Sequence, residues 1–215
     1  MAVAAPRNSA KTAHRYFGAF LAVIVITTLA WSAIHPLDWL TWWLEVSWVL
    51  VGLPIIIWLS RRHGITDILL LLLTIHAVIL VVGGHYTYEK VPIGLWAQEW
   101  FDLARNDYDR LGHFAQGFVP ALIARELLRR TSPLQPGRWL VFLCVASALA
   151  FSAFFEMIEW WSAIALGASA DAFLGSQGDP WDAQWDMLCA LIGAICSMAT
   201  LSRFHERQLR CMRAE

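Results

Sequence analysis

The stretch ITDILLLLLTIHAVILVVG, residues 65–83, is almost continuously apolar. A helix needs about 20 mostly apolar residues to cross the hydrocarbon core of a bilayer. Five further runs of about this length flank the stretch, at residues 16–34, 38–59, 109–129, 139–165 and 182–202. The chain is therefore predicted to be an all-α, polytopic membrane protein, in which a bundle of six transmembrane helices forms a single membrane domain over residues 1–215.

The composition supports a membrane location and argues against several other classes of protein. The chain is 58% hydrophobic with a mean hydropathy of +0.52, and 15% of its residues are charged, whereas soluble domains carry about 25%. Its 13 tryptophans fit the enrichment of this residue at membrane interfaces. A net charge of −1 without a basic stripe gives no indication of nucleic-acid binding. The four cysteines form no paired motif and are predicted to be free.

The basic residues predict the orientation of the chain. Thirteen of the 16 Lys and Arg residues precede the first run, follow the last run, or lie between the second and third or the fourth and fifth runs. Cytoplasmic segments of membrane proteins are enriched in Lys and Arg. Both termini are therefore predicted to be cytoplasmic.

The longest connecting segment is predicted to contain a short helix on the outer side. Pro92 can occupy the first turn of such a helix, and Ile93, Trp96 and Trp100 then recur at helical spacing. The segment is too short to span a bilayer, so we expect an amphipathic interfacial helix at residues 92–105.

Ionisable residues interrupt the last three apolar runs, at the ends that this topology places outside. A charge in the hydrocarbon core is costly, so such residues usually mark a functional site. They form three pairs at helical spacing, each on one helix face: Asp109 with His113, Glu156 with Glu159, and Asp182 with Asp186. Because the three ends fall in the same leaflet, the pairs are predicted to converge.

Structural explanations exist for some of these residues taken alone. Asp109 in a first turn favours the helix dipole, and Asp182 fits the third position of a helix capped by Asp179. Glu159 can be solvated at a helix end. Asp186, one turn deeper than Asp182, has no capping role and is the strongest candidate for a functional residue.

The predicted site is a divalent-metal site. Its predicted ligands are Asp109, His113, Glu156, Asp182 and Asp186, with Glu159, His85 and Glu45 as additional lining residues. Oxygen-rich ligation with one imidazole favours Mg, Mn, Fe or Zn over metals that prefer thiolate ligands.

Other residues in the apolar runs are predicted to be structural. Glu126, next to Arg125, is predicted to form a surface ion pair, and His76 to be a hydrogen-bonded core residue. A stripe of small residues predicts a helix-packing face: Ala190, Gly193, Ala194 and Ser197.

A family resemblance rests on motifs within residues 85–195. These are HYTY (85–88) with Pro92, DRLGHF (109–114) with Arg125-Glu126, Phe155-Glu156 with Glu159, GDPWD (178–182) and QWDM (184–187). Together they resemble the YjdF-like family of bacterial inner-membrane proteins. The resemblance implies a bacterial inner-membrane location and this choice of polar positions, but it implies no reaction. The second half is more distantly similar to VanZ-like proteins, which are associated with glycopeptide-antibiotic resistance.

Three functions are compatible with this pattern, and it leaves open whether the protein is an enzyme. A bound cation can act as a Lewis acid or activate water against a lipid or lipid-linked headgroup, with membrane lipids as partners. Alternatively, the carboxylates relay protons or cations in a transporter, which requires polar residues across the whole bundle. Mid-membrane candidates for such a path are sparse, mainly His76 and Thr74. In the third interpretation the cluster is structural and its members pair with one another.

Overall fold

The computed structural model describes residues 7–167 and 171–214, and its regular elements are all helical. Six long helices account for most of these residues. They are α1 (Arg7–Ser32), α2 (Trp39–His63), α3 (Asp67–Tyr86), α5 (Tyr108–Thr131), α6 (Arg138–Leu166) and α8 (Asp182–Ala214), and two short helices complete the set, α4 (Pro92–Phe101) and α7 (Asp171–Leu174). The predicted all-α class is confirmed.

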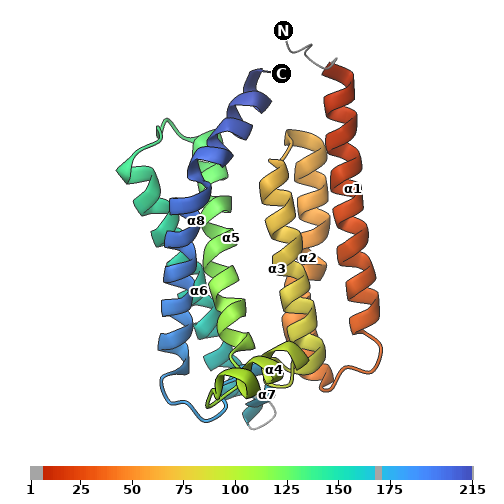
Figure 1. Cartoon of the computed structure of the whole chain (residues 1–215), viewed down its shortest axis with the longest axis vertical. Helices are drawn as coiled ribbons and strands as arrows, with labels where there is room; N and C mark the ends of the chain where they lie inside the picture. Colours follow the sequence, from red (N-terminus) through yellow and green to blue (C-terminus); the bar gives the residue numbers. More distant parts are fainter. Residues whose placement is uncertain (1–6, 168–170, 215) are drawn as a thin grey trace.

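The long helices form two groups, α1 to α3 and α5, α6 and α8 (Figure 1). Within the first group α3 packs against both α1 and α2, and within the second α5 packs against α6 and α8. Contacts between α3 and α5 join the two groups. The short helices α4 and α7 lie at one end of the bundle, which we call the site end. The end of α8 and the start of α1 lie at the opposite end, which we call the terminal end.

Five helices in the described part of the chain are long and apolar enough to cross a membrane. These candidate spans are Thr12–Ser32, Trp39–His63, Asp67–Tyr86, Arg138–Leu166 and Asp182–Met212. The sixth long helix, α5, has 24 residues but is much more polar. Many of its polar side chains are buried against neighbouring helices, among them Gln116, Arg125 and Glu126. A helix enclosed by others faces protein rather than lipid, so it can carry polar groups that find partners there.

The helices α5 and α8 make a close backbone contact. A Cβ atom added to Gly117 in α5 would collide with the backbone of Ala190 in α8, and one added to Gly193 in α8 would collide with the carbonyl of Phe114. Ala190, Ala194 and Ser197 are fully buried along this contact. The small-residue packing face predicted from the sequence is therefore confirmed.

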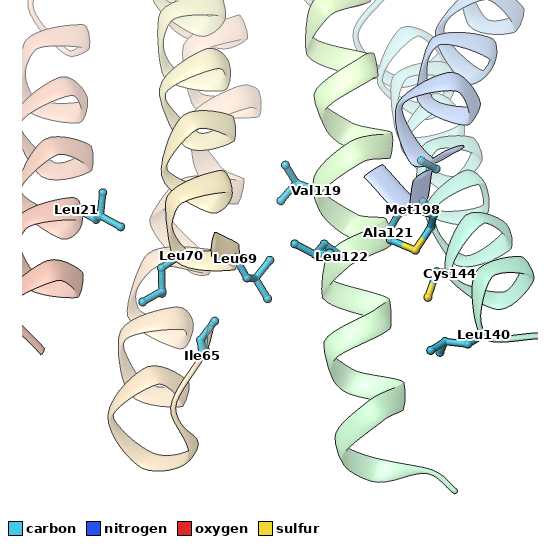
Figure 2. Packing of buried hydrophobic residues seen from close by; sticks show 12 residues of the cluster. Leu21, Ile65, Leu69, Leu70, Val119, Ala121, Leu122, Leu140, Cys144 and Met198 are labelled. Atoms are coloured by element: carbon cyan, nitrogen blue, oxygen red, sulfur yellow. The ribbon is translucent and has the colours of Figure 1, made fainter. Parts of the chain in front are cut away.

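The largest apolar core connects both groups of helices. Figure 2 shows Leu69 of α3 and Leu122 of α5 pointing toward each other across the space between the groups. Leu21 of α1 extends this core on one side, and Met198 of α8 and Cys144 of α6 extend it on the other. All four cysteines are free, as predicted.

Several predicted boundaries were wrong. The first helix, expected to start at residue 16, begins at Arg7, and the second, expected to end at residue 59, ends at His63. The helix expected at residues 92–105 ends at Phe101, because Asp102 adopts a left-handed conformation (φ 51°) and its N–H bonds the carbonyl of Gln98. The last helix, expected to end at residue 202, continues to Ala214. The apolar run marks the part of a helix that fits the membrane, whereas a helix with polar residues can continue beyond it.

Candidate functional site

Polar residues from three helices meet at the site end of the bundle. Asp109 and His113 lie in the first two turns of α5, and Asp186 lies one turn into α8. All three are buried: 7% of Asp109, 4% of His113 and 1% of Asp186 is exposed. The close contact between α5 and α8 brings these residues together, because His113 precedes Gly117, and Asp186 precedes Ala190, by one helical turn.

The three side chains surround a common point. One potential ligand atom from each lies within 4.8 Å of the others. The Nε2 atom of His113 is 3.6 Å from Oδ1 of Asp109 and 4.0 Å from Oδ2 of Asp186, which is too far for hydrogen bonds. Two ligands on one ion lie roughly 3 to 4 Å apart when each is about 2.1 Å from the metal. The spacing therefore suits a divalent cation between the three residues.

Glu156 of α6 approaches His113 from the other side of the imidazole ring. Its Oε1 atom lies 3.5 Å from Nδ1 of His113. Neither of these two buried atoms has a hydrogen-bond partner within the described residues. A carboxylate in this position commonly orients a metal-bound imidazole. The geometry thus suits Glu156 to orient His113 rather than to bind the same ion.

Asp182 is paired with an arginine, Arg105, that was not among the predicted site residues. Arg105 donates a 2.5 Å hydrogen bond to Oδ1 of Asp182 and lies 3.9 Å from Oδ2 of Asp109. It also donates to the carbonyls of Gly175 and Ser176. Burial lowers the pKa of Arg105, but the hydrogen bond to Asp182 and the nearby carboxylate charges raise it above its ordinary value. Arg105 therefore stays charged and neutralises part of the acidic cluster.

Two connecting segments hold Arg105 in place. The backbone N–H of Asn106 donates to Oε1 of Gln177, and the Gln177 side chain donates to the Asn106 carbonyl. At the rim, Arg110 lies 3.0 Å from Asp107 and 3.3 Å from Asp179. The sequence offered no signal for these contacts, because the partners lie about 70 residues apart. The carboxylate of Asp179 accepts a 2.9 Å hydrogen bond from the backbone N–H of Trp181, as expected of a residue that caps the start of α8.

Glu45 and Glu159 lie next to the three central residues. They line a cavity of about 20 Å³ together with Asp109, His113 and Tyr88. This volume is enough for one water molecule or ion. The hydroxyl of Tyr88 donates a 2.9 Å hydrogen bond to Glu45, and burial raises the pKa of Tyr88 well above its ordinary value, which keeps this hydroxyl protonated.

The two remaining candidate histidines do not line the small cavity of the site. His85 has its Nδ1 atom 2.9 Å from the carbonyl of Ser32, and its ring packs 4.5 Å from that of Trp31. His76 lines a separate large cavity, and its Nε2 atom has no hydrogen-bond partner among the described residues. The prediction of a hydrogen-bonded core histidine at this position was therefore wrong.

A second buried polar cluster lies at the terminal end. Glu126, predicted to form a surface ion pair, is only 5% exposed and accepts hydrogen bonds from Thr66 and His205. Arg125 donates to Nδ1 of His205 and to Glu206. Glu126 does form an ion pair, with Arg130 at 2.7 Å, but the predicted surface location was wrong because α8 extends past residue 202 and covers this part of α5. The hydrogen bonds join α3, α5 and α8, so we assign the cluster a structural role.

Residues 17–207 match the family described as "Predicted membrane protein (DUF2238)". The chain belongs to this family. It is also 49% identical to "Inner membrane protein YjdF" of Escherichia coli (strain K12) over 189 residues, which cover 88% of this chain and 90% of that protein. No solved structure matches the chain. The resemblance to YjdF-like proteins is confirmed, and the one to VanZ-like proteins stays a prediction.

Proposed function

We propose that this integral membrane protein binds a divalent cation through Asp109, His113 and Asp186. The observation that carries the proposal is the spacing of their ligand atoms, which all lie within 4.8 Å of one another in a buried position. Oxygen-rich ligation with one imidazole suits Mg²⁺, Mn²⁺, Fe²⁺ or Zn²⁺. A buried Oδ1 atom of Asp186 has no hydrogen-bond partner among the described residues and is a further oxygen for such an ion.

The charge balance of the site supports a cation. Six carboxylates lie in or next to the cluster, namely Glu45, Asp109, Glu156, Glu159, Asp182 and Asp186. Arg105 compensates part of this charge. Like charges in a poorly solvated site disfavour one another unless a cation or shared protons intervene. With all six carboxylates ionised, Arg105 and a divalent ion would together balance three of the six negative charges.

The chemistry that we propose for the bound ion acts on a lipid or lipid-linked headgroup. Three protein ligands leave coordination positions open, so the ion could polarise an ester or phosphate oxygen or activate water. The exposed apolar side chains of α4 lie at the same end of the bundle, with Trp96 56% and Trp100 76% exposed. These side chains support our proposal that α4 rests on the membrane interface, where headgroups are found.

The metal proposal predicts that divalent cations stabilise the protein. At a concentration 100 times the dissociation constant, an ion that binds only the folded state adds about 2.7 kcal/mol to the free energy of unfolding. Thermal unfolding of the detergent-purified protein, stripped with chelator and then titrated with Mg²⁺, Mn²⁺, Fe²⁺ or Zn²⁺, measures this effect. Elemental analysis of protein purified without chelator should find close to one equivalent of metal.

Variants locate the bound cation. Asp186→Asn and His113→Ala should insert normally but lose both the metal and the stabilisation. Glu99→Gln removes a carboxylate of the exposed surface of α4 and should bind metal like the wild type. A wild-type protein that contains no metal and is stabilised by no divalent cation would contradict the proposal.

We further propose that α5 is a sixth membrane span and that the terminal end of the bundle is cytoplasmic. A 24-residue helix is about 36 Å long, which is sufficient to cross a bilayer. The basic residues of the chain collect at the terminal end, as the positive-inside rule requires.

Cysteine labelling tests this orientation. After replacement of the four natural cysteines, Lys90→Cys and Glu99→Cys should react with a membrane-impermeant thiol reagent added to intact cells. Arg62→Cys and Gln135→Cys, at the terminal end, should react only after the cells are permeabilised. Reaction of Arg62→Cys in intact cells would reverse the proposed orientation.

A second candidate function is transport of protons or cations. It is favoured by a cavity that opens toward the terminal end and shares Leu80, Gln116 and Phe155 with the small cavity of the site. These three residues form a thin partition between the two spaces. Shared protons in place of a metal would make stability depend steeply on pH and not on chelator, so the cation titration distinguishes the two functions.

A further inference from the structure

A large cavity lies between the two groups of helices, in the half of the bundle toward the terminal end. Its volume is about 1430 Å³, which exceeds the 300 to 1,000 Å³ typical of pockets for small molecules. All six long helices contribute to its wall, although α6 contributes only Phe151 and Phe155. We call this cavity the groove.

The wall of the groove is apolar along the middle of the helices. Its side chains include Leu21, Val25, Val49, Leu53, Ile56 and Leu73. Gly52 also lines it, and a Cβ atom added there would meet no other atom within 4 Å. The groove therefore has open space next to Gly52 that a larger side chain could fill without a clash.

The mouth of the groove at the terminal end is basic. Arg15 of α1, Arg61 of α2 and Arg207 of α8 line it and are exposed. Within the described residues, none of the three forms an ion pair with an acidic side chain. The acidic residue at the mouth, Asp67, is paired with His14 instead. Three uncompensated positive charges thus adjoin an apolar channel.

We propose that the groove binds an anionic phospholipid, with its acyl chains against the apolar wall and its phosphate at Arg15, Arg61 and Arg207. Five of the six helices that line the groove are long and apolar enough to cross a membrane, where the surrounding solvent supplies acyl chains rather than water. Basic side chains at the membrane surface attract anionic headgroups. An uncharged lipid or an apolar partner helix would leave the three arginines without a counter-ion.

The inner end of the groove adjoins the candidate metal site. Leu80, Gln116 and Phe155 line both the groove and the small cavity next to His113. The end of an acyl chain in the groove would lie against this partition and cover the site from within the membrane. The lipid proposal goes beyond the proposed cation site and does not depend on it.

Native mass spectrometry of the full-length protein tests the proposal. The protein is equilibrated in mixed micelles that contain equimolar phosphatidylglycerol and phosphatidylcholine, and the retained lipid is identified. We expect the wild type to retain one phosphatidylglycerol molecule, with a preference of at least about tenfold over phosphatidylcholine. The triple variant Arg15→Gln, Arg61→Gln, Arg207→Gln should lose this preference, and these exposed positions leave folding unaffected.

A matched pair of variants tests the groove itself. Gly52→Phe fills the open space and should reduce the retained lipid by at least about tenfold. Val51→Phe adds the same ring at the neighbouring position, which is 62% exposed and does not line the groove, so its lipid content should equal that of the wild type.

Four outcomes would overturn the proposal. The wild type could retain no phospholipid, or it could retain both phospholipids equally. The Gly52→Phe protein could retain as much phosphatidylglycerol as the wild type does. The molecule found in the groove could be a second protein chain or a polyprenyl phosphate in place of the phospholipid. Each is independent of metal binding, because the cation content of the same samples is measured separately.

Discussion

Replacing Gly117 by valine is expected to destabilise the protein by more than about 3 kcal/mol, which exceeds the usual cost of overpacking. The added Cβ atom would collide with the backbone of Ala190, and no side chain can rotate to relieve a clash between two backbones. The two helices would have to separate. Most proteins have a small free energy of unfolding, so a loss of this size should leave much of the protein misfolded.

The site should respond to the same substitution. Gly117 follows His113 by one helical turn and Ala190 follows Asp186 by one turn, so separation of α5 and α8 also separates the imidazole from the carboxylate. The milder variant Gly117→Ala should still fold in part and should bind the proposed cation more weakly than the wild type does.

Thermal unfolding and size-exclusion chromatography in detergent measure the effect on stability. Gly52→Val is the matched control, because it makes the same change in a membrane helix at a position where a Cβ atom meets open space. We expect its unfolding temperature to stay close to that of the wild type. A Gly117→Val protein with an unchanged unfolding temperature would mean that α5 and α8 do not pack as closely as described.

Hydropathy predicted the long helices because membrane spans need about 20 apolar residues, and that requirement is visible in a single run of sequence. It could not explain why α5 tolerates Gln116 and Arg125. Their burial depends on the packing of α5 against α6 and against α3 and α8, and the last two are distant in the sequence. The same limit applies to Glu126, whose partner His205 lies 79 residues away in a part of α8 that is not apolar.

The centre of the candidate site was predictable because its residues follow local rules. Asp109 and His113 are four residues apart on one helix face, and Asp186 lies one turn inside a helix without a capping role. The topology then placed these helix ends together. Arg105 could not be predicted, because it lies in an irregular segment and its partner Asp182 is 77 residues away.

The replacement of Arg105 by glutamine is expected to cost about 3 to 5 kcal/mol, the usual effect of removing one partner from a buried ion pair. The Arg105 side chain is 10% exposed, and so is that of Asp182. Glutamine can still hydrogen-bond, but it carries no charge to balance Asp182 and Asp109. It also cannot reproduce the paired hydrogen bonds to the carbonyls of Gly175 and Ser176.

Arg110→Gln is the control for this prediction. Arg110 carries the same charge only five positions away, but its side chain is 26% exposed and its partners Asp107 and Asp179 lie at the rim. Exposed ion pairs contribute about 0 to 1 kcal/mol, so this variant should be nearly as stable as the wild type. If both variants lose the same stability, the effect comes from the net charge of the surface and not from the buried cluster.

The Arg105→Gln variant also links the cluster to the proposed cation. Without Arg105, the repulsion between Asp109, Asp182 and Asp186 is larger, and a divalent ion that binds between them relieves more of it. Saturating Mn²⁺ or Zn²⁺ should therefore raise the unfolding temperature of Arg105→Gln by more than it raises that of the wild type, and the chelated variant should be the least stable form.

Destabilisation without rescue by any divalent cation would keep Arg105 as a structural residue but would argue against an ion at Asp109, His113 and Asp186. An unchanged unfolding temperature in chelator would show that the pair of Arg105 with Asp182 contributes nothing to the folded state.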